Sequence, residues 1–198
     1  KKIAIKKEEL KESGVKKETF ERQRAVNDRM QQLIGGAAGH EVAESLGAIL
    51  YETAEMPWAF HHDLARHCTD ETKHTRMGCE RLALLGEDLR SFPMLLQNYA
   101  LRAKLDPMER FCMMTLVIEA ASFEKKRANV KLFAEHGDAI SERYETYDIR
   151  DEMLHVNFGH TWVPILLRVH QDARSVSDLV QHCRDILEDA LKDERRAS

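Results

Sequence analysis

DETKH at residues 70–74 and DEMLH at residues 151–155 are two copies of one short pattern, an acidic residue followed by Glu-x-x-His. In an α-helix, residues three apart lie on one face, so each copy points a carboxylate and an imidazole in the same direction. Each copy also has a glutamate upstream, on what is predicted to be a separate helix: Glu44 before the first copy and Glu119 before the second. Four carboxylates and two imidazoles in this arrangement are typical of a dinuclear metal site inside a four-helix bundle.

The composition is that of an ordinary globular protein. The 198 residues fit one domain, predicted to span residues 1–198, and 43% of them are hydrophobic, which is enough for a sizeable core. The formal net charge of −4 does not support nucleic-acid binding, and no apolar run approaches the roughly 20 residues needed to cross a bilayer. The first residues lack the apolar stretch of a signal peptide, and the four cysteines form no Cys-x-x-Cys pair. We therefore expect a cytoplasmic protein with no nucleic-acid or membrane partner.

Helical periodicity runs through most of the chain, and strand signals are nearly absent. Prolines, glycines and acidic caps such as Asp106 before Pro107 divide the chain into segments. The expected helices span residues 6–13, 17–34, 38–55, 57–85, 91–103, 106–134, 138–163 and 177–194. We therefore predict an all-α fold, with a four-helix bundle at about residues 37–163 and additional N- and C-terminal helices.

The depth of the glutamates in each helical hairpin offers a geometric test. Antiparallel helices place partner residues at equal distances from the turn that joins them. Glu44 and Glu71 lie 12 and 15 positions from the first turn at Met56, and the corresponding glutamates of the second hairpin lie 17 and 16 positions from His136. At about 1.5 Å of rise per residue, each pair is level to within about one helical turn. Carboxylates at one such level are costly unless they are paired or bind metal.

Six residues therefore form the predicted metal site: Glu44, Glu71, His74, Glu119, Glu152 and His155. A single Glu-x-x-His on a charged helix is usually a solvated face, but two copies at matched depth favour the metal site. Oxygen and imidazole ligands in an open site suit iron or manganese better than structural zinc. We expect two iron ions, with Mn/Fe or Mn/Mn pairs as alternatives.

The pattern Glu44…Glu71-x-x-His74…Glu119…Glu152-x-x-His155 resembles that of the ferritin-like di-iron carboxylate superfamily. The segments at residues 43–74, 117–128 and 151–162 also resemble an uncharacterised bacterial family of that fold. The likeness covers about residues 37–163 and implies a ferritin-like bundle. It implies that the two upstream glutamates are ligands from separate helices, that the glutamates of the two motifs bridge or chelate the metals, and that each motif histidine binds one metal.

The resemblance also implies a reaction class. The expected function is an oxidoreductase that activates dioxygen to hydroxylate, N-oxygenate or desaturate a small organic substrate, with an electron donor as partner. A ferroxidase or iron-handling protein and a non-catalytic bundle with a vestigial metal site are the alternatives, because fold does not decide reaction. The long connector expected at residues 164–176 does not suit a ferritin-type cage, so we expect a monomer or a homodimer.

Two further positions lie one turn before the two motifs. His67 precedes Glu71, and Asp148 occupies the equivalent place before Glu152. Arylamine N-oxygenases of the superfamily carry an extra histidine ligand at such a position, so the resemblance makes His67 a candidate seventh ligand. The alternative is a hydrogen-bonded core histidine. Asp148 is expected to orient His67 if His67 binds metal.

Other polar residues are expected to support the site. Asp70 and Asp151 each lie one position before the glutamate of a motif, off the helix face that carries the ligands. They are predicted to orient the histidine of the opposing helix. Tyr51, two turns beyond Glu44, is either a core tyrosine or a redox or hydrogen-bonding group near the metals. Glu41, one turn before Glu44, is expected on the helix surface or beside the ligands rather than among them.

Overall fold

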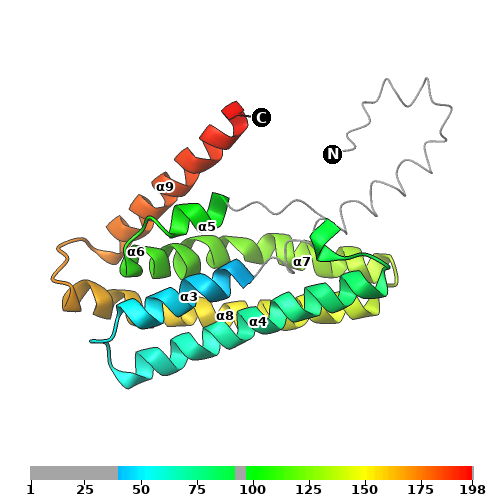
Figure 1. Ribbon diagram of the computed structural model, residues 1–198, viewed down its shortest axis with the longest axis horizontal. Coiled ribbons are helices and arrows are strands. Elements are labelled where there is room, and N and C mark those ends of the chain that lie inside the picture. Colours follow the sequence, from blue (N-terminus) through cyan, green and yellow to red (C-terminus); the bar gives the residue numbers. More distant parts are fainter. Residues whose placement is uncertain (1–39, 92–96, 198) are drawn as a thin grey trace.

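The computed structural model describes residues 40–91 and 97–197, which form an all-α structure without β-strands (Figure 1). Its α-helices are α3 (His40–Glu52), α4 (Trp58–Leu84), α5 (Gln97–Arg102), α6 (Pro107–Cys112), α7 (Ala120–Glu135), α8 (Ala139–Val169) and α9 (Val176–Ala197). A short 3-10 helix, η1 (Leu89–Ser91), and a π-helix, η2 (Met113–Glu119), complete the set. The all-α prediction is confirmed. The helices expected at residues 6–13 and 17–34 lie outside the described residues.

Two antiparallel hairpins pack side by side to form the bundle (Figure 1). One hairpin consists of α3 and α4. In the other, α8 packs against a continuous helix made of α6, η2 and α7. The helix α4 also packs against α8, and α3 packs against α6. The four long helices of the bundle, counting α6, η2 and α7 as one, therefore enclose one interior. The last helix, α9, packs on α6 and η2 outside this interior.

Local signals at the helix ends explain the second hairpin. The carboxylate of Asp106 caps α6 by accepting a hydrogen bond from the Glu109 backbone N–H at 2.8 Å. Asp138 caps α8 in the same way, accepting from the Ser141 backbone N–H at 3.1 Å. Between α7 and α8, Gly137 has a φ of 67°, which glycine adopts without strain, and this lets the chain reverse direction.

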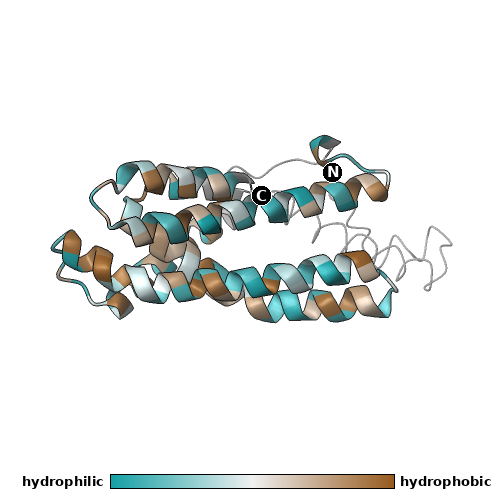
Figure 2. Cartoon of the chain, turned by 90° about the horizontal axis from the view of Figure 1, so that it is seen from below, coloured by the Kyte–Doolittle hydropathy of each residue, from teal (hydrophilic) through white to brown (hydrophobic). Residues whose placement is uncertain are grey.

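The interior contains a polar layer between two apolar clusters. In the larger cluster, Phe60 makes edge-to-face contacts with Phe111 and Trp162 at ring-centroid distances of 5.6 and 5.5 Å. The smaller cluster centres on Leu82 and Phe133. Between them, the buried positions of α4 are His67, Asp70, Glu71 and His74. Hydrophilic and hydrophobic residues therefore mix along the long helices (Figure 2), and within the described ranges no helix has the length and apolar character to cross a membrane.

The helix α8 continues through Pro164, whereas the sequence predicted its end at residue 163. A proline inside a helix removes one hydrogen bond and crowds the carbonyl four residues earlier. Here the helix continues because Val163, Leu166 and Leu167 are buried in the larger apolar cluster. Tertiary packing thus offsets the local cost. The connector to α9 is residues 170–175, which is shorter than the one expected.

Gly159 marks a close approach of α8 to η2, and alanine there should destabilise the protein. An added methyl group would lie 2.7 Å from Leu116 Cδ2 and would collide with the Thr115 hydroxyl, which already donates to the Phe111 carbonyl. We expect Gly159→Ala to lower the free energy of unfolding by about 1–3 kcal/mol, even though alanine favours helices. Urea unfolding followed by circular dichroism measures this. Gly47→Ala is the matched control, because open space surrounds Gly47 and the change there should be neutral or stabilising.

Asp138 pairs with Arg81 of α4 at 2.9 Å, and both side chains are largely buried. Burial raises the pKa of Asp138, but Arg81 and Ser141 outweigh it and hold the pKa below its usual value. The pair therefore stabilises the fold above the unfolded pKa of about 3.9, and this stability is lost as pH falls through the folded pKa. Asp138→Asn, which keeps a good cap, should cost about 1–3 kcal/mol at neutral pH and progressively less toward about pH 3. Urea unfolding across this range tests it, and a loss that does not change with pH would contradict it.

Candidate metal centre

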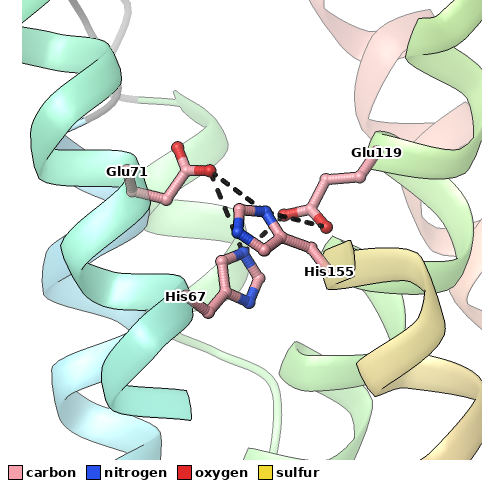
Figure 3. Close-up of side chains that lie close together, drawn as sticks. All are labelled: His67, Glu71, Glu119 and His155. Carbon is pink, nitrogen blue, oxygen red and sulfur yellow. Dashed lines mark hydrogen bonds and ion pairs between the residues drawn. The ribbon is translucent and has the colours of Figure 1, made fainter. Parts of the chain in front are cut away.

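Four buried side chains from α4, η2 and α8 meet in the polar layer (Figure 3). His67 and Glu71 come from α4, Glu119 is the last residue of η2, and His155 comes from α8. The Nε2 of His67 lies 2.8 Å from Glu119 Oε1, and the Nδ1 of His155 lies 3.6 Å from Glu71 Oε1. One nitrogen or oxygen from each residue lies within 4.8 Å of the others, so the four could hold a metal ion.

A second group, made of Glu71, His74 and Glu152, lies beside the first. Glu71 belongs to both groups. Its Oε1 lies 3.4 Å from His74 Nδ1, and the Oε2 of Glu152 lies 4.0 Å from the Nδ1 of His155. The two groups that could hold a metal ion are therefore adjacent and share one carboxylate.

Several donor atoms of these groups have no hydrogen-bond partner. Glu71 Oε1, Glu119 Oε2, Glu152 Oε2 and His155 Nδ1 are buried and make no hydrogen bond. A buried polar atom without a partner costs about 1–3 kcal/mol, and more when it is charged. Such atoms are rare in folded proteins and need an explanation. A cation that accepts their lone pairs removes this cost, so the donor set fits a metal.

The electrostatics of the layer also favour a cation. Burial raises the pKa of Glu119 and of Glu152 well above the usual value, and neighbouring carboxylates raise both further. Burial lowers the pKa of His67 to about 4. Burial, together with the other imidazoles, lowers the pKa of His155 to about 2. These histidines are therefore neutral, which is the form that binds metal.

Asp70 and Asp151 each contact the histidine of the opposing helix. The Nε2 of His74 lies 3.0 Å from Asp151 Oδ2, and the Nε2 of His155 lies 3.4 Å from Asp70 Oδ2. This is the crossed pairing that the sequence predicts. Each contact turns the Nδ1 of the ring toward the shared glutamate. Lys73 in turn donates to Asp70 at 2.9 Å and also pairs with Asp151, which fixes both acids.

The structure corrects the predictions for Glu44 and Tyr51. The side chain of Glu44 is exposed and belongs to neither group, and Tyr51 is 87% exposed, so it is neither a core residue nor a neighbour of the ligands. The reason is which residues of α3 face the interior of the bundle. The buried positions of α3 are Glu41, Ser45, Leu46 and Ile49, and residues 44 and 51 are not among them.

Glu41 is the buried glutamate of α3, with 7% of its surface exposed. It lies 15 positions before Met56, as far as Glu71 lies after it. Its distance from the turn therefore matches that of Glu71 more closely than the distance of Glu44 does. Its Oε2 lies 3.6 Å from Nη2 of Arg102, and its Oε1 has no hydrogen-bond partner. Burial lowers the pKa of Arg102, while Glu41, Glu71 and Glu119 act in the opposite direction. Glu41 thus belongs to neither group, but pairs with a buried arginine whose charge also interacts with Glu71 and Glu119.

The sequence predicted Asp148 beside His67, but Asp148 lies beside His74. Its Oδ1 is 3.2 Å from His74 Nδ1. Burial lowers the pKa of His74, but Glu71, Asp148 and Asp151 outweigh burial and raise it to about 9. His67 instead stacks on His155, with ring centroids 3.7 Å apart.

Two cations and one backbone feature of the site were not predicted. Arg102 is buried and pairs with Glu41, Lys126 is partly buried and pairs with Glu152, and η2 is a π-helix. Lys126 has a sequence signal, because it lies seven residues and therefore two helical turns after Glu119. Arg102 and the π-helix have no such signal, and the place of Arg102 depends on how α5 packs against α3.

Fold and site together define an all-α helical bundle with a buried histidine–glutamate cluster that could hold metal. The chain belongs to the family described as "Protein of unknown function (DUF455)", which matches residues 16–198. This agrees with the predicted resemblance to an uncharacterised family. A comparison with curated proteins and one with solved structures each give no match.

Metal binding should stabilise the fold, because the folded protein presents the ligands together and the unfolded chain does not. At a metal concentration about 100 times the dissociation constant, the gain is about 2.7 kcal/mol. For a chain of this size, we expect Mn(II) to raise the melting temperature by about 5–10 °C. Differential scanning calorimetry of metal-free protein with and without Mn(II) measures the shift. Glu71→Gln should abolish most of it, and an equal shift in that variant would contradict the site.

Proposed function

We propose that this protein is a ferritin-like oxidoreductase with a dinuclear iron centre. The reaction would use dioxygen to hydroxylate, N-oxygenate or desaturate a small organic substrate, with electrons from a separate donor. Manganese in one or both positions is the alternative metal content. The observation that carries the proposal is the pair of buried donor groups that share Glu71 and have unpartnered atoms.

The donor types support iron or manganese. Histidine nitrogens and carboxylate oxygens make up both groups, and no cysteine takes part in either. Such mixed nitrogen and oxygen sets suit Fe(II) and Mn(II), whereas structural zinc sites are usually closed and tetrahedral. His67, Glu71, Glu119 and His155 would hold one ion, and Glu71, His74 and Glu152 would hold the other. In this proposal His67 is a ligand and not only a core histidine.

Ferrous ions in these positions would supply the electrons and the open coordination positions needed to reduce dioxygen. The chain's own contribution is positioning and exclusion of water. Asp70 and Asp151 fix the ring orientation of His155 and His74, which raises the ligand basicity of both. The apolar clusters on either side of the polar layer exclude water from the donor atoms.

Iron binding by metal-free protein under anaerobic conditions tests the proposal. With excess Fe(II), wild-type protein should retain two irons per chain, as measured by mass spectrometry of the metal after removal of unbound iron. Glu71→Ala should lose both ions because the carboxylate is shared, and His74→Ala should lose one. Glu44→Gln is the matched control: its side chain is exposed, so full iron content is expected. Full iron in Glu71→Ala, with an unchanged absorption spectrum, would refute the assignment.

Oxygen uptake then separates the reaction classes. An oxygenase should consume dioxygen in proportion to the bound iron and continue only when reductant and substrate are supplied. Uptake that continues on added Fe(II) alone, with release of ferric iron, would identify an iron-handling protein instead. Iron bound without any uptake would indicate a non-catalytic site.

A further inference from the structure

Lys126 is a partly buried cation beside the second donor group. It lies on α7, and its ammonium is 2.6 Å from Asp148 Oδ2 and 2.6 Å from Glu152 Oε1. Burial alone would lower the pKa of this lysine, but the two carboxylates outweigh burial and raise it, so the side chain stays charged. A positive charge therefore contacts one member of the donor group, Glu152, and one neighbour of that group, Asp148.

Asp148 and Glu152 use different oxygens toward Lys126 and toward the donor group. The oxygens that contact Lys126 are the outer ones, and the inner ones, Asp148 Oδ1 and Glu152 Oε2, are buried without a hydrogen-bond partner. Asp148 Oδ1 lies 3.2 Å from His74 Nδ1, although not in hydrogen-bonding geometry, and the same nitrogen lies 3.4 Å from Glu71 Oε1. Glu71, His74 and Glu152 thus offer donor atoms within 4.8 Å of one another, and Asp148 Oδ1 lies at the edge of this group, beside His74.

We propose that Asp148 and Glu152 are ligands of the second metal ion, and that Lys126, held against their outer oxygens, makes that ion the more weakly bound of the two. The inference rests on the proposed function, since it concerns a centre with two ions. Glu71, Glu119, Asp148 and Glu152 carry the negative charge that two divalent ions neutralise. The ammonium of Lys126 adds one positive charge more, and its repulsion acts most strongly on the nearer ion.

Among residues 40–91 and 97–197, the first donor group has no such cation in direct contact, because Arg102, the buried cation on its side, pairs with Glu41 instead. Within the described residues, neither Glu71 nor Glu119 forms an ion pair with a lysine or an arginine, and the group has two imidazoles, from His67 and His155. The second group has one imidazole and three carboxylates once Asp148 is included. Imidazole suits Fe(II) and its heavier neighbours, whereas carboxylate-rich sites suit Mn(II) or Mg(II). The two positions therefore differ both in the charge around them and in ligand type.

A Mn(II) titration of metal-free protein measures the two affinities separately. Free Mn(II) is followed by electron paramagnetic resonance and total metal by mass spectrometry. In wild-type protein the second ion should bind at least about tenfold more weakly than the first. In Lys126→Met, which keeps the length of the side chain and removes its charge, the second ion should bind at least about tenfold more tightly than in wild type. Lys126→Arg, which keeps the charge, should retain the weak second ion.

Two further variants complete the test. Asp148→Asn should weaken the second ion at least about tenfold and leave the first bound, because it removes a charged ligand of only one position. Lys125→Met is the matched control: Lys125 is the adjacent, exposed lysine, and both affinities should stay at wild-type values. Circular dichroism of each variant establishes that the bundle is folded.

The outcomes separate the two proposals. An unchanged or weaker second ion in Lys126→Met would overturn the role of Lys126, and so would an unchanged second ion in Asp148→Asn. Wild-type protein and Lys126→Met that both bind a single ion would overturn it as well, while leaving the first donor group intact. Wild-type protein that binds neither Mn(II) nor Fe(II) would overturn the proposed function itself.

Discussion

Repulsion among buried carboxylates is the constraint on which the rest of the bundle depends. Two like charges about 4 Å apart repel by about 4 kcal/mol at an effective dielectric constant near 20, and several glutamates share this layer. The layer is buried because α4 continues into apolar packing on both sides of it, through Phe60 and Leu64 before the ligands and Leu82 after them. The apolar clusters thus hold together side chains that would separate in water. Cations, whether metal ions or Lys126, are what make such a layer stable.

The long helix made of α6, η2 and α7 has an irregular backbone where it carries Glu119. A π-helix widens the turn and shifts the phase of the helix on either side of it, and such segments are frequent at functional sites. Here it ends at Glu119, so the carboxylate has a different direction from the one that a regular helix through Met113 would give. Gly159 allows α8 to pack closely against this segment. Backbone irregularity and a missing side chain on the facing helix together bring Glu119 to the donors of α4 and α8.

The sequence predicts the residues whose positions depend on helical spacing alone. Glu71, His74, Glu152 and His155 follow from the three-residue spacing, and the all-α class follows from periodicity. Prediction from the sequence fails where the burial of a residue depends on the rotation of its helix about the helix axis. Both Glu41 and Glu44 have apolar neighbours, and only the packing of α3 decides which of them is buried. It also fails where distant packing overrides a local signal, as in the continuation of α8 through Pro164.

The position one turn before each Glu-x-x-His makes the two halves of the centre different. In α4 this position is His67, which stacks on His155 and contacts Glu119. In α8 it is Asp148, which contacts His74 and a lysine. A neutral imidazole adds a donor without adding charge, whereas an aspartate adds a charge that a neighbouring cation must balance in the metal-free protein. Lys126 supplies that balance, and the same lysine then opposes any second cation. Under the proposal of two ions, a repeated motif therefore gives two positions of unequal affinity, because charge that stabilises the metal-free bundle competes with metal.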